Sequence, residues 1–166
     1  MTTIGVLSDT HGYWDKRYLE FFAPCDEVWH AGDIGSADVL LRLRNNKPTV
    51  RAVYGNADGY DVRNLTHSSL LFDVEKVRVY LTHIGGYPGR YAPGVQRCLF
   101  ENQVKLFVCG HSHILKVMND PALNLLHINP GAAGRQGFQL VRTLVRFVID
   151  GERIKDFELL EIPMNE

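Results

Sequence analysis

Short apolar runs separated by polar, glycine-containing breaks dominate the first third of the chain. The three runs are Ile4–Ser8, Glu27–His30 and Thr49–Tyr54. Apolar runs of this length, with β-branched residues, are typical of buried strands. Between them, Asp15–Ala23 and the stretch capped by Ser36 carry apolar residues at helical spacing, and Pro24 and Pro48 end these stretches. The order predicts a βαβαβ unit with a parallel sheet.

The pattern changes in the second half. Val77–Thr82 alternates apolar and polar residues and pairs with Leu70–Val74 as a predicted hairpin. Arg90–Gln103 follows a glycine- and proline-rich loop and is expected to be helical apart from Pro93 and Gly94 near its start. Further strands are predicted at Leu106–Cys109, Lys116–Met118, Leu123–Ile128, Gln139–Ile149 and Glu152–Ile162. So many strands in a short chain predict an α/β fold of two packed mixed β-sheets flanked by helices, the second half being largely antiparallel.

Composition narrows the class of protein. The 166 residues suit one domain, 1–166, and 45% hydrophobic with 22% charged residues is ordinary for a globular protein. The net charge of −1 argues against nucleic-acid binding through a basic face. No apolar stretch is long enough for a membrane span, and no leader precedes the first strand. The three cysteines lack a C-x-x-C spacing, so we expect reduced thiols in a cytoplasmic protein.

A polar side chain that can bind metal follows each of five predicted strands. Asp9 and His11 follow the first strand, Asp33 the second, Asn56 the third, His83 the run Val77–Thr82, and His111 and His113 the run Leu106–Cys109. Ligands in α/β sheets bind beyond the carboxyl ends of strands. Seven donors are too many for one tetrahedral zinc and suit two ions with a shared carboxylate. Nitrogen and oxygen ligands without thiolate favour Mn, Fe, Co, Ni or Zn, with Mn as the first expectation.

Each of these residues also has a structural interpretation of its own. Asp9 and Asp33 are suited to capping the helices that follow them, Asn56 to a turn, and His83 to a hydrogen bond at a strand end. The equivalent position of all seven residues after strands is what favours a joint site. Of the remaining histidines, we expect His30 and His127 to be hydrogen-bonded near the core and His67 to lie in a surface loop.

At this point the sequence resembles the calcineurin-like metallophosphoesterases, in particular their small bacterial and archaeal phosphodiesterase branch. The resemblance rests on Asp9-Thr10-His11, Gly32-Asp33, Gly55-Asn56-Ala57-Asp58, Thr82-His83, Gly110-His111-Ser112-His113 and Asn129-Pro130-Gly131. It implies a metallophosphoesterase-like β-sandwich with a dinuclear metal centre. By this resemblance Asp9, His11, Asp33 and His113 hold one ion, and Asp33 bridges to a second ion held by Asn56, His83 and His111.

The sequence departs from the family pattern where leaving-group chemistry is concerned. Many members have a histidine directly after the motif asparagine, and here that residue is Ala57. The histidine pair usual near His83 is reduced to one, and Ala132 replaces a usual serine. Two bound cations would activate a water molecule, so the expected nucleophile is metal-bound hydroxide rather than a protein side chain. We therefore expect hydrolysis of a small phosphodiester with a preference for good leaving groups.

The sequence suggests several candidate substrate contacts and more than one possible function. Arg135 and Asn56 are candidate substrate contacts, although Arg135 equally suits a solvated loop; Arg90, Tyr87 and Tyr91 are candidates for the substrate mouth. The alternatives to a phosphodiesterase are a phosphomonoesterase or a cyclic-nucleotide phosphodiesterase. A rival of another class is a non-catalytic scaffold like the retromer vacuolar sorting subunit, whose fold this family shares. A nucleic-acid polymer is not an expected substrate, and a homo-oligomer is compatible with the sequence.

Overall fold

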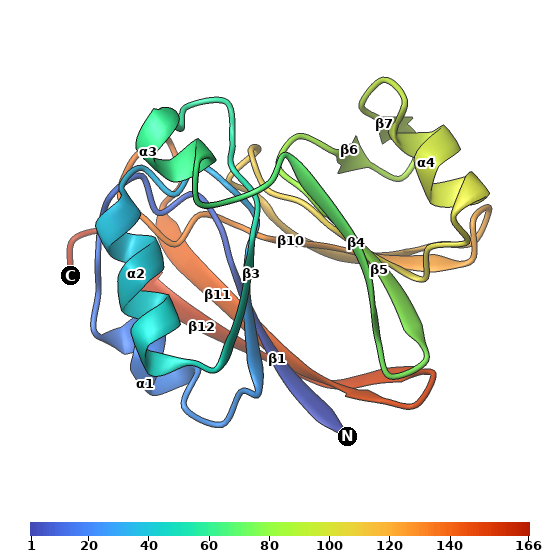
Figure 1. The fold of residues 1–166 in the computed structure, drawn as a ribbon, viewed down its shortest axis with the longest axis horizontal. Coiled ribbons are helices and arrows are strands. Elements are labelled where there is room, and N and C mark those ends of the chain that lie inside the picture. Colours follow the sequence, from blue (N-terminus) through green and yellow to red (C-terminus); the bar gives the residue numbers. More distant parts are fainter.

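Two five-stranded sheets face each other in the computed structural model, which describes residues 1–166 (Figure 1). The first sheet has the order β12-β11-β1-β2-β3, with bounds Arg153–Pro163, Val141–Asp150, Thr2–Leu7, Glu27–His30 and Thr49–Ala52. The second has the order β4-β5-β8-β10-β9, with bounds Ser69–Val74, Val77–Thr82, Leu106–Val108, Leu125–Pro130 and Leu115–Asp120. Both sheets mix parallel and antiparallel pairs, which confirms the predicted fold class.

Short helices cover the outer faces of the sandwich. Helices α1 (Arg17–Phe21) and α2 (Ala37–Asn46) pack with the first sheet, and α4 (Val95–Glu101) packs with the second. The helix expected over Arg90–Gln103 begins only after Gly94, whose φ of 82° is incompatible with a helical turn. The residues before it form a small hairpin that was not expected. It pairs β6 (Gly86–Tyr87) with β7 (Arg90–Tyr91), and a one-turn helix, α3 (Tyr60–Arg63), was also not expected.

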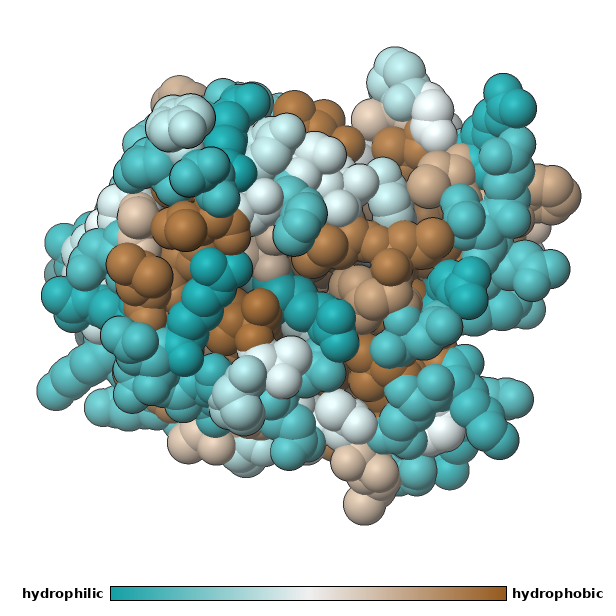
Figure 2. Space-filling view, in the orientation of Figure 1, coloured by the Kyte–Doolittle hydropathy of each residue, from teal (hydrophilic) through white to brown (hydrophobic).

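The main hydrophobic core lies between the two sheets. Its buried side chains come from the inward faces of both layers and include Trp29 and Phe147, whose rings meet at 6.0 Å. Trp29 also meets Phe72 of the opposite sheet edge-on at 5.1 Å, and Arg51 covers the Phe72 ring at 4.1 Å. Figure 2 shows apolar residues in the middle of this face and hydrophilic residues around them. The aromatic contacts between Trp29, Phe72 and Phe147 in the core hold the two sheets in their alignment.

No helix in the structure has the length and apolar character that crossing a membrane requires.

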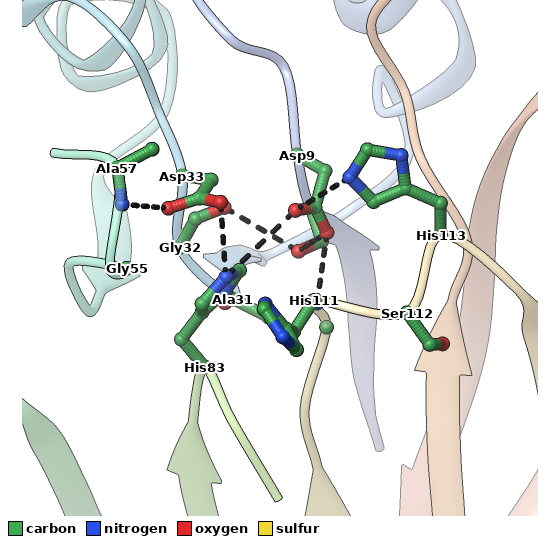
Figure 3. A network of polar contacts seen from close by, with 12 residues as sticks. Asp9, Ala31, Gly32, Asp33, Gly55, Ala57, His83, His111, Ser112 and His113 are labelled. Atoms are coloured by element: carbon green, nitrogen blue, oxygen red, sulfur yellow. Dashed lines mark hydrogen bonds and ion pairs between the residues drawn. The ribbon is translucent and has the colours of Figure 1, made fainter. Parts of the chain in front are cut away.

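Parallel pairing brings six strand ends to one side of the molecule. Strands β1, β2 and β3 run parallel in the first sheet, with Val6 beside Trp29 and Trp29 beside Arg51. In the second sheet β5, β8 and β10 are also parallel, although antiparallel pairs dominate that half of the chain as predicted. The carboxyl ends of the six strands therefore lie at one edge of each sheet, and the polar residues that follow them meet there (Figure 3).

Candidate metal centre

Six of the seven predicted donors gather into two groups at this edge. One group contains Asp9, His11 and His113, and the other contains Asp33, His83 and His111; within each group the donor atoms lie within 4.8 Å of one another. Each group takes residues from loops of both sheets, because Asp9, His11 and Asp33 follow strands of the first and the other histidines follow strands of the second. Figure 3 shows five of these side chains pointing toward a common centre, namely Asp9, Asp33, His83, His111 and His113.

The backbone at the site is held in an unusual conformation. Asp9, His11, Asp33, His111 and His113 all have positive φ, between 45° and 72°. This left-handed region is uncommon for residues other than glycine, and such residues cost free energy that the surrounding structure must supply. The turn after each strand therefore aims the next side chain back across the strand ends. A cluster of five such residues is typical of a functional site rather than of ordinary loops.

The loop after β8 packs so closely on the loop after β1 that position 110 requires glycine. A Cβ atom at Gly110 would lie 2.0 Å from Ser8 Oγ and 2.8 Å from Asp9 Oδ2. In its absence Ser8 Oγ donates to Asp9 Oδ2 at 2.6 Å, and the backbone N–H of His111 donates to the same oxygen at 3.1 Å. These bonds occupy one carboxylate oxygen of Asp9 and leave Oδ1 directed at the histidines.

The two carboxylates sit between the imidazoles. His113 Nε2 lies 3.2 Å from Asp9 Oδ1, and His83 Nε2 lies 3.1 Å from Asp33 Oδ2. His11 Nε2 is 3.7 Å from an oxygen of each carboxylate. Burial raises the pKa of Asp9, but His11, His113, His83 and Ser8 together outweigh burial and hold that pKa well below its usual range. Burial likewise raises the pKa of Asp33, and His83 together with the N–H of Ala57 lowers it overall. Both carboxylates are therefore charged at neutral pH.

Several buried atoms at the centre lack a hydrogen-bond partner. Asp9 Oδ1, His11 Nε2 and His83 Nε2 are each buried and have none. Buried polar atoms are normally paired, so three orphaned atoms aimed at one region need an explanation. All three are good ligands for a divalent ion, and the carboxylates supply the compensating negative charge. The donor set therefore fits the two metal ions that the sequence led us to expect.

Two of the histidines are oriented by bonds through their other ring nitrogen. The Nδ1–H of His83 donates to the backbone carbonyl of Ala31 at 2.7 Å, and that of His113 donates to Gln139 Oε1 at 3.0 Å. With the proton on Nδ1, Nε2 carries a free lone pair toward the centre. Such outer contacts fix both the tautomer and the orientation of metal-ligating histidines.

Sequence reasoning missed the residues that hold the loops in place. Asp58 accepts backbone N–H bonds from Ile34 at 3.1 Å, Gly35 at 2.8 Å and Gly55 at 2.9 Å, which joins the loop after β2 to the loop after β3. Asn129 donates to the carbonyl of Gly110 at 3.0 Å and so supports the loop that carries His111 and His113. Asp58 and Asn129 stand in the motifs quoted above, which was the available signal, whereas nothing in the sequence marked Gln139.

Asn56 and Arg135 are less clearly placed. Asn56 is exposed on the loop beside Asp33, where the N–H of Ala57 donates to Asp33 Oδ1 at 2.9 Å. Its role as ligand or substrate contact stays a prediction. The guanidinium of Arg135 donates to the backbone carbonyl of Glu166 and lies 4.6 Å from the centre of the Tyr13 ring. It therefore has protein partners rather than being a freely solvated loop cation, and its contact with substrate also stays a prediction.

The remaining histidines are distributed much as expected, with one exception. His30 is buried between Thr10 Oγ1, at 3.0 Å, and the N–H of Gly32, at 3.1 Å, and burial lowers its pKa to about 4. His67 is exposed. His127 is buried as expected. Its Nδ1 has no hydrogen-bond partner, so the prediction that this histidine is fully hydrogen-bonded is wrong. Its neighbour on the same sheet face is the apolar ring of Phe107.

The fold and the centre together define a two-layer α/β metalloprotein whose donors come from the strand ends of both sheets. Comparison with known proteins agrees with this class. The model of the calcineurin-like phosphoesterase superfamily domain matches residues 2–152, and the chain belongs to this family.

Individual relatives support the same assignment. A probable metallophosphoesterase of Methanothermobacter thermautotrophicus is 31% identical over 137 residues, covering 78% of this chain and 76% of the relative. The solved structure of an archaeal phosphodiesterase superposes with a TM-score of 0.77 at 20% identity, over 96% of this chain and 99% of that one. Vps29 of Entamoeba histolytica, solved with Zn²⁺, superposes with a TM-score of 0.72 at 15% identity, over 98% and 99%. At these identities the two structures establish a shared fold.

Proposed function

We propose that this protein hydrolyses phosphodiesters and depends on two divalent metal ions held at the strand ends. The observation that carries the proposal is the pair of donor groups, each with a carboxylate and two histidines, whose inner atoms are buried without hydrogen-bond partners. Membership of the phosphoesterase family supplies the reaction class. The archaeal phosphodiesterase with the same fold supports a diester as the substrate.

The ligands of the two ions are assigned from the two groups. Asp9, His11 and His113 belong to one ion, and Asp33, His83 and His111 to the other. Asp33 would be shared by the two ions, as the family resemblance implies; its Oδ2 lies 3.1 Å from His83 Nε2 and 3.7 Å from His11 Nε2, which belong to different groups, whereas Asp9 Oδ1 lies 3.9 Å from the nearer histidine of the other group, His83. Asn56 is the proposed seventh ligand from the adjoining loop. Imidazole and carboxylate without thiolate favour Mn, Fe, Co, Ni or Zn, with Mn first.

Residues of the chain itself would supply charge compensation, orient the imidazoles and leave access for the substrate. When bound, a pair of divalent ions neutralises phosphate charge and acidifies coordinated water. Asp9 and Asp33 hold compensating negative charge, and Ala31 and Gln139 keep two imidazoles turned inward. His111 is exposed, so its side of the centre is open to substrate. Ala57 offers no proton donor to the departing oxygen, so good leaving groups are favoured.

The test is a metal-restored hydrolysis assay. The protein is stripped with chelator and assayed on bis-p-nitrophenyl phosphate and p-nitrophenyl phosphate after addition of Mn²⁺, Ni²⁺, Co²⁺, Zn²⁺ or Mg²⁺. The variants are His111→Ala and, as a matched control, His67→Ala, which removes an exposed histidine outside the centre. We expect metal-dependent cleavage of the diester that the first variant loses and the second keeps. Cleavage of the monoester alone would replace the proposal by a phosphatase, and metal binding without turnover would favour a protein-binding role.

A further inference from the structure

A pocket of about 230 Å³ adjoins the centre on the side of His111. It lies between the β6–β7 hairpin and the outer face of the second sheet, and His111 and Ser112 form its end nearest the centre. Its walls are largely apolar, with Ile84, Tyr87 and Ile114 among them. Two of the three residues considered for the substrate mouth, Tyr87 and Arg90, line this pocket, whereas Tyr91 does not.

The hairpin that forms one wall is fixed to the sheet. The loop at Gly85 is packed so closely that a Cβ there would lie 2.3 Å from Phe107. The carbonyl of Gly86 accepts a weak bond from Cys109 Sγ at 3.5 Å, and Tyr91 Oη donates to Asp120 Oδ2 at 2.6 Å. The pocket is therefore built into the fold, as small-molecule sites generally are.

The charged residues of the pocket are all basic. Arg90 and Lys116 line it, and no aspartate or glutamate does. Neither cation has an ion pair or a hydrogen bond within the protein; Lys116 Nζ rests 4.0 Å from the centre of the Tyr87 ring. His127 also lines the pocket, and burial, with Lys116 nearby, lowers its pKa to about 4, so the imidazole is neutral at pH 7. The pocket thus holds two positive charges without a carboxylate partner, beside walls that are largely apolar.

We propose that this pocket binds one ester group of the substrate, and that this group is small and carries a second anionic group, a carboxylate or a phosphate. The proposal rests on the phosphodiesterase function proposed above, because His111 is shared by the centre and the pocket. The volume limits the size of the group. At about 30 Å³ for a water molecule in the liquid, 230 Å³ corresponds to roughly eight non-hydrogen atoms. The two cations then select an anionic group of that size over a neutral or cationic one.

Calorimetry on the Mn²⁺-loaded protein tests this without turnover. The probes are 3-methylbutyl phosphate, 2-carboxyethyl phosphate and phosphocholine, which present a neutral, an anionic and a cationic group of similar size beside the same phosphate. We expect 2-carboxyethyl phosphate to bind about tenfold more tightly than 3-methylbutyl phosphate, which is the effect expected of one charge-assisted contact. Phosphocholine should bind more weakly than either.

Two variants separate the pocket from general electrostatics. The double substitution Arg90→Gln with Lys116→Gln should reduce the tenfold preference to less than twofold. Arg153→Gln removes an exposed arginine at the distant β11–β12 turn and should leave the preference unchanged. Inorganic phosphate, which lacks the extra group, should bind equally to the protein and both variants if the double substitution leaves the centre intact.

The outcomes distinguish the two proposals. Diester hydrolysis with no preference among the three probes would overturn the pocket proposal and leave the proposed function standing. A charge preference that the double substitution removes, without hydrolysis of any diester, would support the pocket and overturn the function. A preference that survives the double substitution would overturn the pocket as its source.

Discussion

Replacement of Gln139 by leucine should weaken one of the two metal sites and spare the other. Gln139 Oε1 accepts the Nδ1–H of His113 at 3.0 Å, and its amide nitrogen is itself held by the carbonyls of Gln136, at 2.8 Å, and Gly134, at 3.3 Å. A Cβ at Gly137 would lie 2.4 Å from both Gln139 Oε1 and His113 Nδ1, so glycine is what permits the contact. His83 has a backbone partner instead, which the substitution leaves in place.

The size of the effect follows from the contact that is lost. Loss of such an outer bond to a ligating histidine usually costs 10- to 100-fold in metal affinity, about 1.4–2.8 kcal/mol. The bond here is between neutral groups and partly exposed, so we expect about tenfold. Asp9 is the main cause of the raised pKa of His113, and the bond to Gln139 adds to it, so loss of the bond makes the ring a slightly weaker ligand.

A competition titration of Zn²⁺ against a chromophoric chelator measures both sites at once. Gln139→Leu should lower one affinity about tenfold and leave the other within twofold. Gln139→Glu keeps an acceptor beside Nδ1 but loses the bonds to the carbonyls of Gly134 and Gln136, so it should retain more of the affinity than Gln139→Leu. Gln136→Leu is the matched control, because residue 136 contributes only its backbone carbonyl to this contact. Two unchanged affinities in a folded Gln139→Leu protein would refute the proposed role of this bond.

Three further predictions concern other parts of the molecule. Without an acid at Ala57, log kcat/KM for aryl phosphodiesters should fall steeply as the leaving-group pKa rises, and Ala57→His should flatten that slope; equal slopes would refute the argument. Asp58→Ala leaves three backbone N–H groups without their acceptor and should lower the free energy of unfolding by about 3 kcal/mol, against a few tenths for the exposed control Asp61→Ala, as measured with urea. Burial raises the pKa of Asp15, but its arginine partners lower that pKa to about 2. The charged Asp15 therefore stabilises the fold fully above its unfolded pKa near 3.9, and this stabilisation is lost as the pH falls toward 2. Asp15→Asn should therefore destabilise the protein by about 2 kcal/mol at pH 7, with a difference that shrinks at pH 2 in thermal unfolding; a difference independent of pH would contradict this.

The sequence predicted the strands and the donors well because both depend on local patterns. Apolar runs such as Ile4–Ser8 identified buried strands to within two residues. A candidate donor follows each of the five runs within three residues, and for four of them that residue stands in one of the two donor groups, whereas Asn56 does not. Parallel pairing then brought those residues together. In the first sheet that pairing followed from the βαβ order, whereas the parallel pairing of β5, β8 and β10 in the second sheet was not predicted. The two-sheet architecture was likewise predictable from the number of strands.

The contacts that tune the site depend on tertiary structure and could not be read from the sequence. Gln139 was expected to begin a strand, but β11 begins at Val141, and Gln139 contacts His113 from the loop before it. Asp58 joins two loops that lie 24 residues apart in the chain. The hairpin before α4 replaced an expected helical turn because Pro93 and Gly94 prevent the helix from starting earlier. His127 was expected to be hydrogen-bonded, but its place beside Phe107 leaves one ring nitrogen unpaired.

The division of each donor group between the two sheets has a consequence for folding kinetics. His111 and Asp9 are 102 residues apart in the chain, and neither sheet alone holds a complete group. The groups therefore form only after the sandwich has closed, late on the folding pathway. An interaction absent from the transition state slows unfolding and leaves the folding rate unchanged. Bound metal would thus stabilise the native state without stabilising the folding transition state, and would lengthen the lifetime of the native state.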